Sequence, residues 1–366
     1  MPFPSDIKTL TSLRFFAAVL IILNHLKHYL LFDMKDYTGL WEQSYLAVDF
    51  FFILSGFILT HVYLGGIESG QLSIRSFLIR RLARLYPLHL LTLLIMTGLA
   101  MTSLRFGSIV PWSGHFPVGT FVLNFLLLHG WGFVTSLAFN IPSWSISAEW
   151  FAYMSFPFLL PWLLAKKPGF VLIISFGGLA ALWALSLIYF PRPTTQLTSD
   201  CSILRIMPEF TVGCCLYLVA RRLKPLWRPG LLLSGGSVVA LMIMHFSWPD
   251  LLIIPVFMLI IVAAADLTRK DYRGWLASDQ MVFWGEASYA IYMVHYVVIV
   301  LILNGAYNYI GQDFYAHYYP ALFALTTIVI FVVAALVHVR FEHPARRWVL
   351  KRFDQTGRGN AAAAGE

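Results

Sequence analysis

The sequence predicts an all-α membrane protein, a polytopic bundle of about ten transmembrane helices with one re-entrant or interfacial segment. Of the 366 residues, 59% are hydrophobic and only 12% are charged, whereas soluble domains carry about 25% charged residues. Apolar runs of the roughly 17–25 residues needed to cross a bilayer recur along the chain. They fall at residues 8–31, 46–65, 84–103, 143–165, 169–190, 202–220, 230–248, 250–267, 283–304 and 319–340.

A further apolar run, residues 118–139, is interrupted by Asn124, His129, Gly130 and Gly132. Loop charge decides whether this run crosses the membrane. If it enters without crossing and the N-terminus is cytoplasmic, most of the 26 lysines and arginines lie on the cytoplasmic side. Cytoplasmic loops are enriched in these residues, so the charge bias favours ten spans with both termini in the cytoplasm.

We expect one membrane domain over residues 1–352 and a short, disordered cytoplasmic tail over residues 353–366, which are mostly small and polar. The first apolar run is too long for a signal peptide and lacks a small-residue cleavage site, which indicates an uncleaved first span. Cys201, Cys214 and Cys215 do not have zinc-site spacing, and no bound metal is expected. The net charge of +8 is typical of basic cytoplasmic loops, so nucleic acid is not an expected partner.

Two polar residues stand out in the first span, Arg14 and His25. They are eleven positions apart, which at about 100° per residue places them on nearly the same face, roughly 16 Å apart along the axis. Charged groups inside a bilayer usually face the bundle interior or an aqueous cavity. We therefore hypothesise that this face lines a reaction channel and that His25 is a general base; the alternative is a helix-packing histidine.

Two carboxylates are predicted at about the depth of His25. Asp49 opens the second span, and Glu149 lies near the outer start of the fourth. A neighbouring carboxylate fixes the tautomer of a histidine base and stabilises its imidazolium form. Both residues also suit a simpler role as negative charges at helix N-termini.

A basic helix face follows the second span, made by Arg75, Arg80, Arg81 and Arg84. Guanidinium groups bind phosphates bidentately, so the face is a candidate site for a phosphorylated compound from the cytosol. The alternative is a topogenic cluster at the lipid headgroups. The sequence has no Walker loop and no dinucleotide-binding glycine motif.

Two further pairs of residues fall inside predicted spans. Ser55-Gly56 is typical of close helix packing, and the GxSxG elbow that a nucleophilic serine would need is absent. Tyr292 and His295 are three positions apart on the ninth span and would face one cavity or serve in helix packing.

Taken together, these motifs resemble the acyltransferase-3 family of membrane acyltransferases. The likeness covers about residues 8–341, and the five pieces occur in the family's order. The pieces are Arg14 and His25 within TSLRFFAAVLIILNH, DFFFILSGFIL at Asp49–Leu59, RRLARLYP at Arg80–Pro87, PSWSISAEWFAY at Pro142–Tyr153 and GEASYAIYMVH at Gly285–His295.

The resemblance implies an O-acyltransferase in a bacterial cytoplasmic membrane. Such an enzyme moves an acyl group, commonly acetyl, from cytosolic acyl-CoA to a hydroxyl of an extracytoplasmic or lipid-linked glycan. By the same resemblance, His25 is the base, Arg14 supports the acyl donor, and Arg80, Arg81 and Arg84 hold coenzyme A phosphates. Acetyl-CoA would be a co-substrate, with no tightly bound cofactor, and the chain looks most like compact members that modify exopolysaccharides.

The family's WSxSxE element places Glu149 in the site with Trp144 and Ser147 beside it. Tyr292 and His295 complete the expected substrate-site residues. The competing interpretation is a proton-coupled transporter of a glycan or an anion, which the missing internal repeat and the one-sided basic face disfavour.

Overall fold

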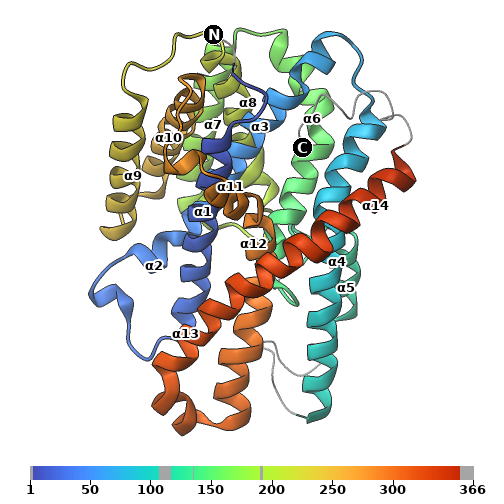
Figure 1. Ribbon diagram of the computed structural model, residues 1–366, viewed down its shortest axis with the longest axis vertical. Coiled ribbons are helices and arrows are strands. Elements are labelled where there is room, and N and C mark those ends of the chain that lie inside the picture. The colour runs from blue at the N-terminus through green and yellow to red at the C-terminus, as the bar shows by residue number, and fades with distance from the viewer. Residues whose placement is uncertain (1–2, 107–116, 135, 190–192, 355–366) are drawn as a thin grey trace.

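The computed structural model describes residues 3–106, 117–134, 136–189 and 193–354. Over these residues the chain forms helices and no strand, which confirms the all-α prediction. Long helices run side by side in a tall bundle (Figure 1). The helices are α1 (Lys8–Leu26), α2 (Leu40–Gln43), α3 (Ala47–Glu68), α4 (Ile74–Phe106), α5 (Val118–Phe125), α6 (Trp144–Leu164), α7 (Pro168–Tyr189), α8 (Ile203–Ala220), α9 (Pro229–His245), α10 (Ile253–Arg269), α11 (Asp279–Glu286), α12 (Ser288–Ile299), α13 (Gln312–Val337) and α14 (His343–Phe353).

A helix lies at each of the ten predicted spans. Within the described residues, 8 helical segments are long and apolar enough to cross a membrane. The α9 helix is apolar but shorter, and α6 falls outside this set. Residues 118–139 begin with the eight-residue α5, which at about 1.5 Å per residue is too short to span a bilayer. The protein is therefore an integral membrane helix bundle.

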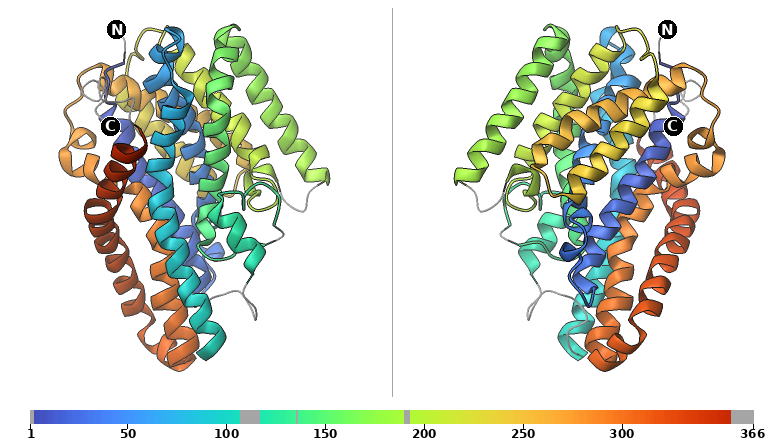
Figure 2. Two further views of the ribbon diagram at one scale, coloured as in Figure 1. Left: turned by 90° about the vertical axis from the view of Figure 1, so that its right-hand side faces the viewer. Right: turned by 90° about the vertical axis from the view of Figure 1, so that its left-hand side faces the viewer.

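Both ends of the described chain lie at one end of the bundle (Figure 2). The carbonyl oxygen of Ser5 is 3.3 Å from Nε2 of His61, near the end of α3. Asp354, directly after α14, pairs with Arg80 near the start of α4, with Oδ2 and Nε 2.9 Å apart. The predicted tail, residues 353–366, lies outside the described residues from position 355 onward.

The basic clusters gather at this same end. Arg221, just after α8, pairs with Glu68 at the end of α3 at 2.9 Å. Lys270, just after α10, donates a hydrogen bond to the carbonyl oxygen of Leu226 at 2.7 Å. This distribution is the one that a positive-inside topology requires.

Two glycines allow α3 and α8 to cross at close range. A Cβ atom at Gly56 would lie 2.1 Å from the carbonyl oxygen of Phe210, and one at Gly213 would lie 2.0 Å from that of Ile53. The opposing atoms belong to the backbone and cannot rotate away. Gly56 thus makes the close helix contact that the Ser55-Gly56 pair predicts.

Replacing Gly56 by alanine is expected to destabilise the bundle by about 1–3 kcal/mol, because the added methyl group forces the two backbones apart. Thermal unfolding of the purified protein in detergent measures this effect. Gly65→Ala is the matched control in the same helix, since a Cβ there meets nothing within 4 Å. Equal melting temperatures for the two variants would contradict the prediction.

Candidate active site

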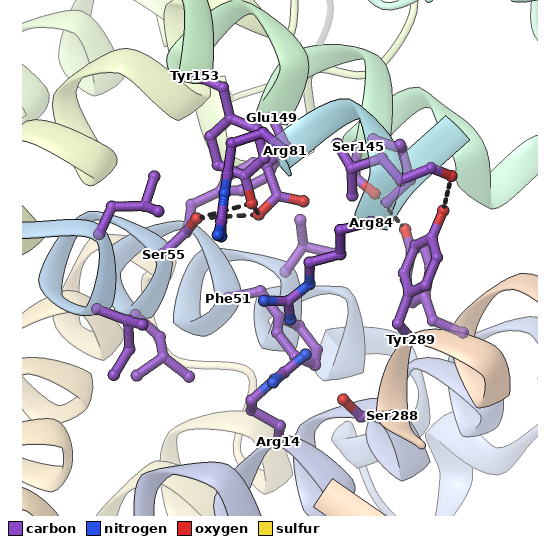
Figure 3. A pocket seen from close by; sticks show the side chains of 18 residues that line it. Arg14, Phe51, Ser55, Arg81, Arg84, Ser145, Glu149, Tyr153, Ser288 and Tyr289 are labelled. Carbon is purple, nitrogen blue, oxygen red and sulfur yellow. Dashed lines mark hydrogen bonds between the residues drawn. The ribbon is translucent and has the colours of Figure 1, made fainter. Parts of the chain in front are cut away.

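A cavity of about 100 Å³, lined by charged, polar and apolar side chains, lies inside the bundle between α1, α3, α4, α6 and α12. Figure 3 shows charged side chains from α1, α4 and α6 pointing into it. We call it the arginine cavity. Its polar lining consists of Arg14, Ser55, Arg81, Arg84, Ser145, Glu149, Tyr153, Ser288, Tyr289 and Tyr292.

The cavity carries an excess of positive charge. The guanidinium groups of Arg14 and Arg84 point toward each other across it (Figure 3). Neither forms a hydrogen bond or ion pair with any residue that the structure describes. Arg81 is buried and donates a hydrogen bond from Nη2 to the Tyr63 hydroxyl at 2.9 Å. Glu149 is the one carboxylate among the described lining residues, so the cavity suits an anionic ligand.

Ser55 and Glu149 meet on the opposite wall of this cavity. The Ser55 hydroxyl donates a hydrogen bond to Oε1 of Glu149 at 2.9 Å. The Tyr153 hydroxyl donates a second, very short hydrogen bond to the same oxygen. Ser55 therefore lies in the cavity wall and is not the packing residue expected from the sequence, because its neighbour Gly56 is the residue that meets the α8 backbone closely.

His25 lies deeper along α1 and contacts a second histidine. Its Nδ1 is 2.9 Å from the Ile21 carbonyl oxygen and 3.3 Å from Nε2 of His295 on α12. The centres of the two imidazole rings are 4.9 Å apart. The ring of Tyr292, which lines the arginine cavity, is 5.9 Å from that of His295. The α12 helix thus connects the cavity to His25.

Asp49 pairs with Arg205, and the described contacts include none between Asp49 and His25. Arg205 binds both of its carboxylate oxygens, through Nε at 3.0 Å and Nη2 at 2.7 Å. The two side chains are 0% and 1% exposed, and the Trp144 ring lies over the guanidinium at 5.3 Å. The expectation that Asp49 supports the base is therefore wrong at the level of contacts, because a buried cation holds it. Trp144 covers this ion pair.

The Ser147 hydroxyl forms hydrogen bonds with two backbone groups. It donates to the Leu127 carbonyl oxygen at 2.7 Å and accepts from the Gly130 amide at 3.0 Å. It thereby ties the irregular segment after α5 to the start of α6. These contacts explain its complete burial without a substrate.

The arginines of the basic face of α4 have two different surroundings. Arg81 and Arg84 line the arginine cavity. Arg80 instead pairs with Asp354, which also accepts a hydrogen bond from the Ser76 hydroxyl at 2.8 Å. Of the three arginines expected to act together, the structure therefore keeps Arg80 apart, because Asp354 holds it, and brings Arg81 and Arg84 together with Arg14.

Sequence reasoning did not identify Tyr153 or Arg205. Tyr153 is one turn after Glu149 on α6, and this i,i+4 spacing could have indicated the hydrogen bond. Arg205 lies within the predicted span 202–220, where a charged residue requires a partner. The partner itself, Asp49, is not apparent from local sequence.

Comparison with known proteins gives one family for nearly the whole chain. Residues 7–338 match the model of a family described as an acyltransferase domain. Acyltransferase MdmB of Streptomyces mycarofaciens is 30% identical over 380 residues, which cover 94% of this chain and 92% of that protein.

More distant relatives have printed names that specify O-acetyl transfer. Peptidoglycan O-acetyltransferase OatA of Listeria monocytogenes is 26% identical over 71% of this chain and 46% of its own length. Putative peptidoglycan O-acetyltransferase YrhL of Bacillus subtilis is 24% identical over 94% of this chain and 56% of its own length. The chain thus spans about half of these two relatives. No solved structure matches.

Proposed function

This chain belongs to the acyltransferase domain family, and on that premise we propose that it is a membrane O-acyltransferase using acyl-CoA, with acetyl-CoA as the usual donor. The acceptor is a hydroxyl of an extracytoplasmic or lipid-linked glycan, of the kind found in exopolysaccharide repeat units. The names of the more distant relatives, peptidoglycan O-acetyltransferases, support a glycan acceptor.

The arginine cavity is the observation that carries this proposal. Arg14 and Arg84 face each other there without an acidic partner among the described residues, which leaves both free for an anion. Arg81 and Arg84 bind phosphate groups of the donor, because guanidinium groups match phosphate oxygens bidentately. Glu149, held by Ser55 and Tyr153, balances part of the arginine charge.

His25 is the general base of the transfer. The acceptor hydroxyl gives its proton to His25 while its oxygen bonds to the acyl carbon of the thioester. The bond from the acyl carbon to sulfur breaks with its electron pair on sulfur, and the coenzyme A thiolate then takes the proton from His25. Direct transfer of this kind needs only the base and a hydrogen-bond donor to the oxyanion that forms on the acyl carbon.

The proposed orientation puts the basic end of the bundle in the bacterial cytoplasm. Both termini then lie inside, and the arginine cavity opens to the compartment that contains acyl-CoA. His25, eleven residues further along α1, lies nearer the outer side, where the glycan arrives. We treat residues 1–352 as one catalytic membrane domain, surrounded by membrane lipids and holding no tightly bound cofactor or metal.

Replacing Arg84 by methionine is expected to weaken acetyl-CoA binding about 10- to 100-fold, because a charged hydrogen bond to phosphate is worth roughly 1.5–3 kcal/mol. Equilibrium binding of radiolabelled acetyl-CoA to the purified protein measures this change. Arg84 is the better choice than Arg81, since removing Arg81 leaves the Tyr63 hydroxyl without its described donor.

Arg75→Met is the matched control for charge, because Arg75 is exposed on the first turn of the same helix. Its affinity for acetyl-CoA is expected to stay within about twofold of the wild type. An unchanged dissociation constant in Arg84→Met would refute the phosphate site. Mass spectrometry of the surface glycans from a deletion strain identifies the acceptor, because the glycan that this protein acylates loses its ester there.

A further inference from the structure

The hydrogen bonds of His25 and His295 determine which ring nitrogen carries each proton. Nδ1 of His25 is 2.9 Å from the Ile21 carbonyl oxygen, and Nδ1 of His295 is 3.2 Å from that of Ile291. A carbonyl oxygen only accepts hydrogen bonds. Both neutral rings must therefore be protonated on Nδ1 and carry a lone pair on Nε2.

The contact between the two rings agrees with this assignment. Nε2 of His295 lies 3.3 Å from Nδ1 of His25, so the lone pair of His295 accepts from the same N–H that His25 directs at Ile21. The opposite protonation of His295 would place two N–H groups against each other. Nε2 of His25 has no hydrogen-bond partner over the described part of the chain, which leaves its lone pair available.

We propose that His295 is a positioning residue that, together with the Ile21 carbonyl oxygen, holds His25 in the Nδ1–H tautomer and presents Nε2 as the basic nitrogen. This inference rests on the proposed function, in which His25 is the base. When Nε2 takes the proton of the acceptor hydroxyl, the Nδ1–H of the new imidazolium stays hydrogen-bonded to His295 Nε2. His295 neither takes that proton nor touches the substrate.

A neutral partner of this kind is needed because no described carboxylate forms a hydrogen bond or ion pair with either ring. Asp49, the acidic residue expected for this task, is held by Arg205. His295 is 0% exposed, so water does not compete for its lone pair. A hydrogen bond from imidazolium is stronger in such surroundings than in water. A buried imidazole thus takes the orienting role that a carboxylate has in many hydrolase triads.

Two substitutions separate orientation from packing. His295→Gln retains a side-chain carbonyl oxygen that can accept from His25 Nδ1–H, whereas His295→Met has similar bulk and lacks such an acceptor. We expect His295→Met to lower kcat about 10- to 100-fold with KM for acetyl-CoA changed less than about twofold. His295→Gln is expected to stay within about fivefold of the wild-type kcat. Equal losses in the two variants, or no loss in His295→Met, would overturn the proposal.

A spectroscopic measurement tests the tautomer without relying on activity. The ¹⁵N NMR spectrum of histidine-labelled protein in bilayers distinguishes protonated from unprotonated ring nitrogens, and His25→Asn identifies the His25 signals by difference. We expect a protonated Nδ1 and an unprotonated Nε2 for His25 in the wild-type protein. A protonated Nε2 would overturn the inference even if His295→Met failed to fold.

The two proposals fail in different ways. If the spectrum gives the Nδ1–H tautomer but His25→Ala still transfers acyl groups, the hydrogen-bonded pair stands and the catalytic role of His25 is wrong. If His25→Ala is inactive while the spectrum gives the Nε2–H tautomer, the proposed function stands and the orienting role of His295 is wrong.

Discussion

Replacing His25 by alanine is expected to lower the rate of acyl transfer about 100- to 10,000-fold, the usual contribution of a positioned general base. The acceptor hydroxyl would then lose its proton to water alone. Donor binding is expected to stay within about twofold, because His25 is outside the set of described residues that line the arginine cavity. The measurement is formation of the acyl ester on a glycan acceptor by purified protein in liposomes, alongside acetyl-CoA binding.

His28→Ala provides the control for loss of an imidazole on the same side of the bundle, since His28 is exposed one turn beyond His25. This variant is expected to retain the wild-type rate within about twofold. If the His25→Ala variant still forms the acyl ester on the glycan and only export of the glycan falls, the protein is a transporter. The arginine cavity is then part of a transport path.

The positions of the helices could be predicted because crossing a bilayer is a local property of the sequence. The length of an apolar run decides whether it can span the bilayer, and the charge of the flanking loops sets the orientation of the span. The prediction that residues 118–139 do not cross as a helix used the same local information, and α5 is indeed only eight residues long. The spacing of Arg14 and His25 predicts only that they share a helix face; in the structure Arg14 lines the arginine cavity and His25 contacts His295 on α12.

The neighbours of each polar residue could not be predicted in this way. His25 meets His295 across 270 positions of sequence, and Asp49 meets Arg205 across 156. The predicted depth of a residue leaves open which helix it faces. The sequence predicts similar depths for Asp49 and His25, yet α3 turns Asp49 toward α8 and α1 turns His25 toward α12. Depth is thus a weak basis for pairing two residues.

Replacing Arg205 by methionine is expected to destabilise the protein by about 3–5 kcal/mol, because it leaves a buried carboxylate without its cation. Two acidic groups depend on this arginine. Asp49 is held through both oxygens, and Glu209, buried one turn along α8, interacts electrostatically with Arg205 and Asp49. The oxygens of Glu209 accept no hydrogen bond from the described residues. Thermal unfolding in detergent, at matched protein and detergent concentrations, measures the loss.

Replacing Asp49 is expected to destabilise the protein less than replacing Arg205. This difference tests whether Asp49 serves to pair with Arg205. Asp49→Asn removes one of two acids and leaves Glu209 to pair with Arg205, so its cost is expected to be only about 1–2 kcal/mol. Arg221→Met, which breaks the exposed pair with Glu68, is the control and is expected to cost at most about 1 kcal/mol. If Arg205→Met unfolds no more readily than Arg221→Met, the ion pair does not hold α3 against α8. Asp49 would then be available for the supporting role at His25 that its depth suggested.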